Sequence, residues 1–377
     1  MGVSYGTIKT IVSKYDEDGE AGIETRYASC GVVVRTASAQ IIYDKGLSLR
    51  QLHPTWGADR IRVEMLILYG KLSPSVRTLQ RWYRQERYSE PKMRHNEPQI
   101  GKSQGVHNIW QVDAKEQLIL QDGQVACYLT FTDEYSGAWL GSAVFAYHRI
   151  NQVPVIEVRA ACIRLFMRWG KAGSFRVDNG EPLGNPKMNA TPALALWLIA
   201  MDVDMIWNKP HSPTQNAVVE RMQGTSSRWA EVHKCANAVD LQTRLDTECI
   251  VQRAQLVVRR LNNQNRLQAF PELETSRRSF DELTFDAQRV YTFLAQKIYT
   301  RKVSSGGVLT FYGQKFNIGL KNKGITVEIK LNKTDVSWNF YDNQTLLAIK
   351  PALHLSEENI KNLGIFNPIT TLQQKTK

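Results

Sequence analysis

The sequence predicts an α/β protein with a mixed five-stranded sheet at its centre, a helical region before it and a small β domain after it. Three observations support this. Residues 106–232 read as strand-strand-strand-helix-strand-helix-strand-helix; residues 50–88 show two short amphipathic helices; and residues 301–350 hold short alternating runs separated by Gly, Asn and Asp. With 377 residues, 42% hydrophobic and 22% charged, the chain is long enough for two or three globular domains.

The central region begins as an antiparallel meander and continues into right-handed crossovers, which gives a mixed sheet covered by helices. We expect the first and fourth strands to be neighbours in this sheet. The expected strands are residues 106–120, 125–132, 139–147, 174–177 and 203–207, and the expected helices are residues 154–169, 191–201 and a third that follows the loop "HSPTQN".

The helical region is predicted to form a helix-turn-helix. The run "ADRIRVEMLILY" (58–69) has helical apolar spacing and ends at Gly70, and Ser73-Pro74 is the expected start of a second helix over residues 75–87. An ordinary helical hairpin with a solvated basic face is the alternative. In the DNA-reading version the contacts come from the side chains that face away from the apolar stripe, namely Arg77, Thr78, Arg81 and Arg84.

Charge is unevenly distributed along the chain. The net charge is +12, yet residues 106–210 carry nine basic and ten acidic side chains, a net of −1. A basic chain favours a polyanionic partner such as DNA. No apolar run is long enough to span a membrane and no signal peptide is visible, so a cytoplasmic location is expected. The five scattered cysteines argue against disulfides and against a zinc site.

Three carboxylates lie at the ends of the predicted elements of the slightly acidic centre. Asp113 belongs to the first strand, Asp178 ends the fourth strand in "FRVDNGE", and Glu220 begins the third helix. In this element order all three would meet at one rim of the sheet. Converging carboxylates need a cation, and hard oxygen ligands suit Mg²⁺ or Mn²⁺, a pair of which can clamp the two oxygens of an in-line phosphoryl displacement.

Each acid also has a non-catalytic interpretation. An isolated strand Asp is usually a turn or edge residue, and a Glu near a helix N-terminus suits the helix dipole. Four other acids compete with the chosen three for the metal-ligand role, namely Glu116, Asp133, Glu134 and Glu181. Asp133 and Glu134 rank lower because they lie in a tight turn, and Glu181 ranks lower because it follows the Asn-Gly break.

These stretches resemble the DDE transposases of bacterial insertion sequences, within the retroviral-integrase superfamily. "WQVDAKE" resembles their first-Asp motif, "FRVDNGEP" their Asp-Asn-Gly motif and "SPTQNAVVER" their Pro-x-x-Asn-x-x-x-Glu-Arg motif. "HPTWGADRIRVEM" and "SPSVRTLQRW" resemble the second helix-turn-helix that precedes the core in those proteins. The resemblance covers most of residues 1–350.

The resemblance implies a ribonuclease H-like core that holds two Mg²⁺ or Mn²⁺ ions through Asp113, Asp178 and Glu220. It implies metal-dependent cleavage of double-stranded DNA at transposon ends followed by strand transfer, by a homo-oligomer assembled on paired ends in a bacterial nucleoid. Asn216 and Arg228 are further expected DNA contacts. The 41 residues between Asp178 and Glu220 are more than is usual in the group, so an insertion before the third helix is expected.

The expected domain order follows from these motifs, and it has two functional alternatives. Residues 1–30 resemble only the last part of a first helix-turn-helix. A plain metal nuclease or a catalytically inactive, transposase-derived DNA-binding regulator would share the same fold. The expected units are a partial first helix-turn-helix (1–30), a helix-turn-helix domain (31–90), a linker (91–105), the catalytic core (106–232), a helical connector (233–300), a small β-barrel or sandwich (301–352) and a polar tail (353–377).

Overall fold

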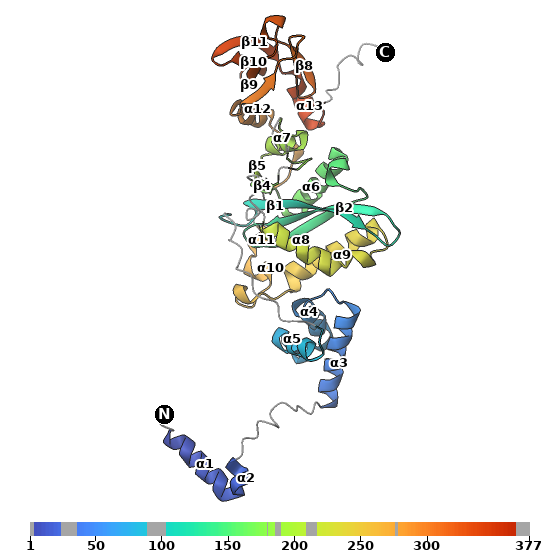
Figure 1. Ribbon diagram of the computed structural model, residues 1–377, viewed down its shortest axis with the longest axis vertical. Helices are drawn as coiled ribbons and strands as arrows, with labels where there is room; N and C mark the ends of the chain where they lie inside the picture. The colour runs from blue at the N-terminus through green and yellow to red at the C-terminus, as the bar shows by residue number, and fades with distance from the viewer. Residues whose placement is uncertain are drawn as a thin grey trace.

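The chain is elongated, with helices at one end, a central sheet, and a β domain at the other end (Figure 1). The computed structural model describes residues 4–23, 36–88, 103–178, 180–184, 190–208, 217–275 and 278–366. The N-terminal helices are α1 (Tyr5–Asp18), α2 (Glu20–Ile23), α3 (Ala37–Leu52), α4 (Ala58–Tyr69) and α5 (Val76–Gln85). Most of the predicted linker lies outside the described residues.

The central sheet has five strands in the order β3-β2-β1-β4-β5. The strands are β1 (Ile109–Ile119), β2 (Val125–Asp133), β3 (Trp139–Phe145), β4 (Ser174–Val177) and β5 (Asp204–Trp207). β2 pairs antiparallel with both β1 and β3, whereas β4 pairs parallel with both β1 and β5. The predicted mixed five-stranded sheet and the predicted pairing of its first and fourth strands are therefore confirmed.

Helices cover both faces of this sheet (Figure 1). They are α6 (Val155–Trp169), α7 (Ala193–Ala200), α8 (Ala217–Ala230) and α9 (Ala238–Ile250). Because side chains alternate along β2, Leu129 and Phe131 join the core under α6, while Tyr128 joins a second cluster that contains Met222 of α8 and Leu245 of α9. The sheet is thus buried on both sides, and its rims are where polar side chains can gather.

The helical domain of α3, α4 and α5 has its own core. Leu79, Trp82 and Tyr83, on the predicted apolar stripe of α5, are buried against α3 and α4. One detail differs from the prediction: the N-cap of α5 is Ser75, whose hydroxyl accepts from the Thr78 amide, and Ser73 instead ends the short 3₁₀ turn that follows α4. The Ser73-Pro74 pair was the wrong start because Ser73 caps the end of the 3₁₀ turn Gly70–Leu72, and Ser75 caps the start of α5.

The C-terminal unit contains a four-stranded sheet and a separate hairpin around one core. The sheet has the order β11-β10-β9-β6, and the hairpin pairs β7 with β8. The strands are β6 (Tyr299–Lys302), β7 (Val308–Phe311), β8 (Gln314–Asn317), β9 (Thr326–Asn332), β10 (Ser337–Asp342) and β11 (Thr345–Pro351). Among the described residues these sheets do not close into one hydrogen-bonded barrel, so the barrel part of the prediction is not confirmed.

Two helical segments join this C-terminal unit to the rest of the chain. All eight residues of α7 are buried, because one side packs on the central core and the other on the C-terminal core together with α12 (Ala287–Ala295). Shorter helices complete the connector, namely α10 (Arg266–Ala269) and α11 (Glu272–Thr275). A polar tail was expected from residue 353, but up to residue 366 the structure differs from this. The segment contains α13 (Glu357–Lys361), and Leu355, Ile360 and Ile365 are buried.

Two further expectations concern the chain as a whole. No helix in the described ranges combines the length and apolar character that crossing a membrane requires. Cys127, Cys162, Cys235 and Cys249 are free, buried thiols, as expected, and Cys30 lies outside the described residues.

Candidate active site

The parallel pairing of β1 and β4 places two of the three predicted acids side by side. Gln111 of β1 is in register with Arg176 of β4, so two residues further along each strand the chain reaches Asp113 and Asp178. Both acids line one cavity of about 20 Å³, together with Gly180, Glu181 and neighbouring apolar side chains. A volume of this size holds about one water-sized species.

The third acid influences the same place electrostatically. Burial, the charge of Asp178 and the charge of Glu220 raise the pKa of Asp113 to about 6, against the lowering effects of the Ala114 amide and Lys115. Glu220 is exposed on the first turn of α8 and does not line the cavity. The charges of the other two acids therefore act on Asp113, whose ionised form would be favoured by a bound cation.

The turn after β4 leaves room around the Asp178 carboxylate. The Gly180 amide donates a hydrogen bond of 2.9 Å to Asp178 Oδ1. A Cβ at position 180 would lie 3.1 and 3.2 Å from the two carboxylate oxygens, so any side chain there would crowd them. Glycine at this position thus keeps the carboxylate oxygens accessible to a ligand.

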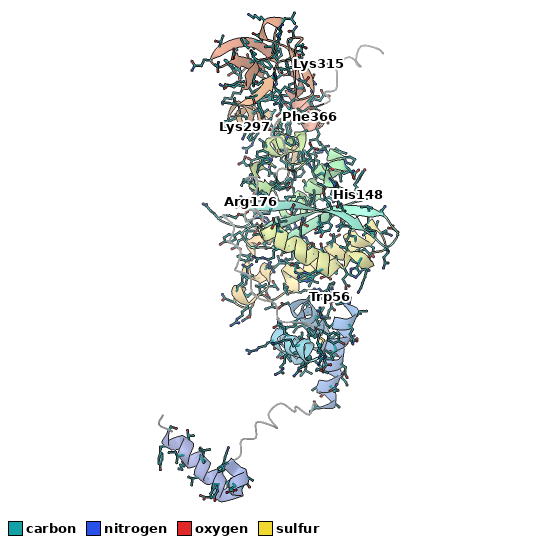
Figure 2. The ribbon with its side chains drawn as sticks, in the orientation of Figure 1. Trp56, His148, Arg176, Lys297, Lys315 and Phe366 are labelled. Carbon is teal, nitrogen blue, oxygen red and sulfur yellow. The ribbon has the colours of Figure 1, made fainter. Side chains whose placement is uncertain are left out.

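A polar chain from the sheet holds the start of α8. The Gln111 side-chain oxygen accepts a 2.9 Å hydrogen bond from the Val219 amide, one of the unpaired N–H groups of a first helical turn. Gln111 Nε2 and Arg176 Nε both donate to Glu134 Oε2, at 2.8 and 2.7 Å; Figure 2 labels Arg176 on the central sheet. These hydrogen bonds therefore fix Val219, the immediate neighbour of Glu220.

The sequence analysis did not identify Gln111, Glu134 or Arg176 as positioning residues. Gln111 lies two positions before Asp113, so both belong to the same face of β1. That spacing was the available signal.

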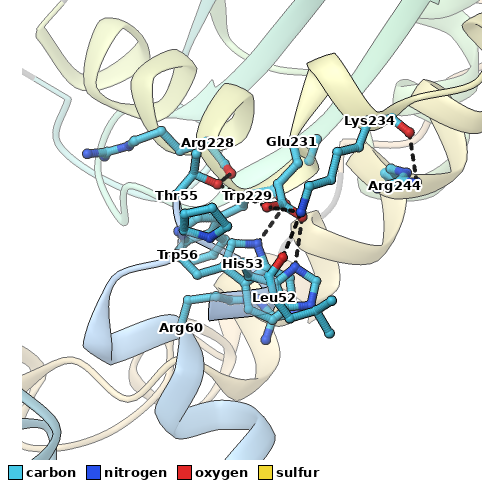
Figure 3. A network of polar contacts seen from close by, with 12 residues as sticks. Leu52, His53, Thr55, Trp56, Arg60, Arg228, Trp229, Glu231, Lys234 and Arg244 are labelled. Atoms are coloured by element: carbon cyan, nitrogen blue, oxygen red, sulfur yellow. Dashed lines mark hydrogen bonds and ion pairs between the residues drawn. The ribbon is translucent and has the colours of Figure 1, made fainter. Parts of the chain in front are cut away.

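Hydrogen bonds from the helical domain hold the other end of α8 (Figure 3). Trp56 Nε1 donates to the Trp229 carbonyl at 3.0 Å, and Thr55 Oγ1 donates to the Arg228 carbonyl at 2.7 Å. Just beyond the helix, His53 Nδ1 lies 2.7 Å from a Glu231 carboxylate oxygen. The helical domain is therefore docked on the same helix that carries Glu220.

A buried ion pair strengthens this docking. Arg60 of α4 donates from Nε and Nη2 to the two carboxylate oxygens of Glu248 in α9, at 2.7 and 2.9 Å. Arg60 is 3% exposed and Glu248 is 5% exposed, so neither charge has water as an alternative partner. Separating the helical domain from the core would remove the Arg60 partner of Glu248, whereas Arg60 would keep Glu64 of α4, 2.9 Å from its Nη1.

Three of the four acids that ranked lower in the sequence analysis, Glu116, Asp133 and Glu134, have protein partners of their own, whereas Glu181 lines the cavity of Asp113 and Asp178. Asp133 accepts from the His107 amide at 2.7 Å and from Ser136, and it is fully buried. Glu134 accepts from the Ser103 amide in addition to Gln111 and Arg176. Their carboxylates serve the fold, and their partners leave little capacity for a metal ion.

The donor chemistry of Asp113, Asp178 and Glu220 fits a hard divalent cation, but their side chains are not drawn together into a ligand set. Nowhere in the described ranges do three or more His, Cys, Asp or Glu side chains stand close enough to hold a metal ion. Asp113 and Asp178 could share an ion across their cavity. Glu220 could join only if its side chain, which is exposed and without a polar partner among the described residues, turned towards them.

The predicted DNA contacts have different surroundings. Arg77, Arg81 and Arg84 are exposed on α5, whereas Thr78 is half-buried and its hydroxyl lies 2.9 Å from that of Ser75 at the helix N-cap. Arg228 is exposed, and its Nε donates to the Gly224 carbonyl. Asn216 lies outside the described residues. These side chains do not gather at the acids; three arginines lie together on the helical domain.

Comparison with known proteins gives distant structural similarities. No family model matches the sequence, and no curated protein matches it. The structure is similar to the catalytic core domain of BIV integrase, with a TM-score of 0.32 and 14% identity over 45% of this chain and 97% of that one. It is also similar to a chain of the simian T-cell lymphotropic virus intasome in complex with PP2A regulatory subunit B56 gamma (TM-score 0.36, 12% identity, 81% and 96% covered).

A further similarity is to the HTLV-2 integrase catalytic core domain in complex with magnesium, with a TM-score of 0.33 and 15% identity over 45% of this chain and 99% of that one. All three likenesses are remote. Conclusions about chemistry therefore have to come from the side chains of this chain.

Proposed function

We propose that this protein is a metal-dependent DNA strand transferase of the transposase type, which cleaves DNA at transposon ends and joins the cut strand to a target. The observation that carries the proposal is the shared cavity of Asp113 and Asp178, in which the charges of Asp178 and Glu220 act on Asp113. Two adjacent carboxylates on neighbouring strands, with a third on a movable side chain, are suited to bind Mg²⁺ or Mn²⁺ between protein and phosphodiester.

The residues of the chain have separate roles in this proposal. Asp113 and Asp178 would hold the metal, and Glu220 would complete the ligand set. When bound, a pair of such ions activates the attacking oxygen and stabilises the leaving oxygen of the phosphodiester. Gly180 leaves room for the phosphate beside Asp178, and Gln111 keeps the start of α8 at the sheet.

DNA recognition would come mainly from the helical domain. Exposed Arg77, Arg81 and Arg84 form a basic face on α5, with Thr78 beside them, and Arg228 and Asn216 would add contacts near the core. Because the helical domain is docked on α8 by Trp56 and Thr55, DNA held by α5 would have a fixed orientation relative to Glu220. Action on two paired ends by a homo-oligomer is part of the proposal.

The test is metal-dependent nicking and joining of a labelled oligonucleotide that carries the end of the host element. Wild type is expected to nick and join in Mg²⁺ or Mn²⁺, and Asp178→Asn is expected to bind the same DNA without either reaction. Absence of both reactions in wild type, with DNA binding intact, would reject the proposal.

A catalytically inactive DNA-binding regulator is the second candidate. It is favoured by one observation: in the described parts of the chain the three acids do not form a metal-ligand cluster. The two candidates differ in whether DNA is cut when metal is present. A regulator binds DNA but does not nick it in Mg²⁺ or Mn²⁺, whereas the strand transferase nicks DNA in these metals only when Asp113 and Asp178 are intact.

A further inference from the structure

Two arginines outside the acidic site lie together without a carboxylate between them. Arg260 follows α9 and the turn beyond it, and Arg266 begins α10. A Cβ built on Gly137, in the turn between β2 and β3, would lie 3.7 Å from Arg260 Nη2 and 3.9 Å from Arg266 Nε. Both guanidinium groups therefore face the same point on the backbone of this turn.

The guanidinium group of Arg266 lies in an unfavourable environment for a positive charge. It is only 9% exposed, and its Nε is buried without a hydrogen-bond partner among the described residues. Its Nη1 donates to a neutral group, the Gln252 carbonyl, at 3.2 Å. Burial and the positive charges of Arg260 and Arg221 lower the pKa of Arg266 to about 10. A buried charge surrounded by like charges is unfavourable unless an anion compensates it.

The acids closest in sequence to Gly137 are committed elsewhere. Asp133 accepts from His107 and Ser136, and Glu134 accepts from Gln111 and Arg176 on the sheet. Arg260 is exposed and has no hydrogen bond or ion pair within the part of the chain that the structure describes. Its long side chain can therefore move aside and close over a ligand that reaches Arg266.

We propose that Arg260 and Arg266, beside Gly137, form a binding site for a backbone phosphate of the DNA, with Arg221 adding positive charge. Guanidinium groups match phosphate oxygens in geometry and charge. Gly137 has a φ of +66°, and the missing side chain leaves the space between the two guanidinium groups open. This inference rests on the proposed function only for the identity of the polyanion as DNA.

The position of this arginine site relative to Asp113 fits a phosphate close to the scissile one on the same DNA strand. Trp110 pairs with Asp133 and Asp113 with Thr130, so the turn that contains Gly137 starts three residues along β1 from Asp113. That is roughly 10 Å at about 3.3 Å per strand residue. The site would therefore hold a backbone phosphate other than the scissile one.

The experiment compares Arg260→Ala with Arg259→Ala in the full chain, measuring affinity for a duplex oligonucleotide by fluorescence anisotropy across a series of salt concentrations. Both residues are exposed and both changes remove one charge, which makes Arg259→Ala a matched control. Arg260→Ala is expected to weaken binding roughly tenfold and to reduce the salt slope by about 0.9, the value for one phosphate. Arg259→Ala is expected to leave the slope at its wild-type value.

A second arm identifies the phosphate. Single methylphosphonate substitutions along the oligonucleotide each remove one negative charge, and one of them should weaken wild-type binding but leave Arg260→Ala binding unchanged. Equal salt slopes for Arg260→Ala and Arg259→Ala would overturn the inference. Methylphosphonate substitutions that weaken wild-type and Arg260→Ala binding by the same factor at every phosphate would overturn it as well. Nicking of the same duplex is scored separately, so a protein that binds through Arg260 but never nicks contradicts the proposed function and not the phosphate site.

Discussion

Two groups of carboxylates lie along β1, and their surroundings are opposite. Beside the start of β1, Asp133 at the end of β2 and the next residue, Glu134, are buried and accept hydrogen bonds from amides, a hydroxyl, an amide side chain and a guanidinium group. Further along, Asp113 and Asp178 each accept one backbone amide, and Glu220 has no polar partner in the described residues. The carboxylates of the first group are hydrogen-bonded by several protein donors, whereas those of the second group have few donors in the described residues.

This difference separates a structural carboxylate from a candidate ligand. Burial alone does not, because Asp133 is more buried than Asp178. What distinguishes the second group is the small number of hydrogen-bond donors combined with neighbouring negative charge, which adds to burial in raising the pKa of Asp113. A carboxylate in that condition gains most from a cation, whereas Glu134 would have to give up Arg176 to bind one.

The largest expected effect is on catalysis. Asp113→Asn and Asp178→Asn should each lower the rate of DNA nicking by at least about 10³-fold, a loss of roughly 4 kcal/mol of transition-state stabilisation. DNA binding should stay unchanged or become tighter, because a negative charge near the phosphates is removed. A gel-based nicking assay beside an anisotropy titration measures both. Strongly weakened DNA binding in these variants would argue against their role as metal ligands.

The next effect is on stability and belongs to the other group of acids. Glu134→Gln should lower the free energy of unfolding by about 3 kcal/mol, because the nearly buried Arg176 loses its anionic partner. Urea denaturation followed by circular dichroism measures this change. Asp178→Asn is the matched control and should unfold within about 0.5 kcal/mol of wild type. Equal destabilisation by both changes would remove the distinction between the two groups.

A smaller effect concerns pH and the metal-free protein. The pKa of Asp113 is raised from 3.8 to about 6 in the folded state, so the folded state binds the proton more tightly than the unfolded state. Wild type therefore loses stability as the pH rises from about 4 to 6, and the loss is constant above that range. Asp113→Asn avoids this loss.

In EDTA at pH 7, Asp113→Asn should be more stable than wild type by about 1 to 2 kcal/mol, a value below the full 1.36 kcal/mol per pKa unit because the site is partly exposed. The advantage should shrink as the pH falls towards 4. Thermal unfolding of both proteins between pH 4.5 and 8 measures it. An advantage that is independent of pH would mean that the substitution acts through packing.

The smallest effect is on DNA reading by the helical domain. Arg81→Ala or Arg77→Ala should reduce the salt slope of DNA binding by about one phosphate and weaken affinity several-fold. Gln80→Ala, an exposed and uncharged neighbour on α5, should leave the slope unchanged. Identical slopes for all of these variants would place the basic face of α5 outside the DNA interface.

Local patterns in the sequence were sufficient for much of the fold. The strand over residues 174–177 and the helix over residues 58–69 were predicted with the bounds that the structure has, because both are bracketed by clear turn signals. The neighbourhood of Asp113 and Asp178 followed from the order of strands and helices, since few topologies satisfy right-handed crossovers.

What the sequence could not reveal depends on contacts between distant residues. The hydrogen bonds that join Gln111 to Val219 and Arg176 to Glu134 span 108 and 42 positions, and no periodicity encodes them. The docking of Trp56 on Trp229 is equally non-local. The segment after residue 352 looked like a polar tail because its apolar residues are sparse, yet Leu355, Ile360 and Ile365 each fill the C-terminal core.

The most direct test of the central claim is anomalous diffraction from crystals of the full chain soaked in millimolar Mn²⁺. The account predicts Mn²⁺ bound by carboxylate oxygens of both Asp113 and Asp178, at about 2.0 to 2.2 Å, with Glu220 turned towards the same ions. Ordered carboxylates at both positions with no manganese peak between them, or manganese bound only elsewhere on the chain, would contradict it.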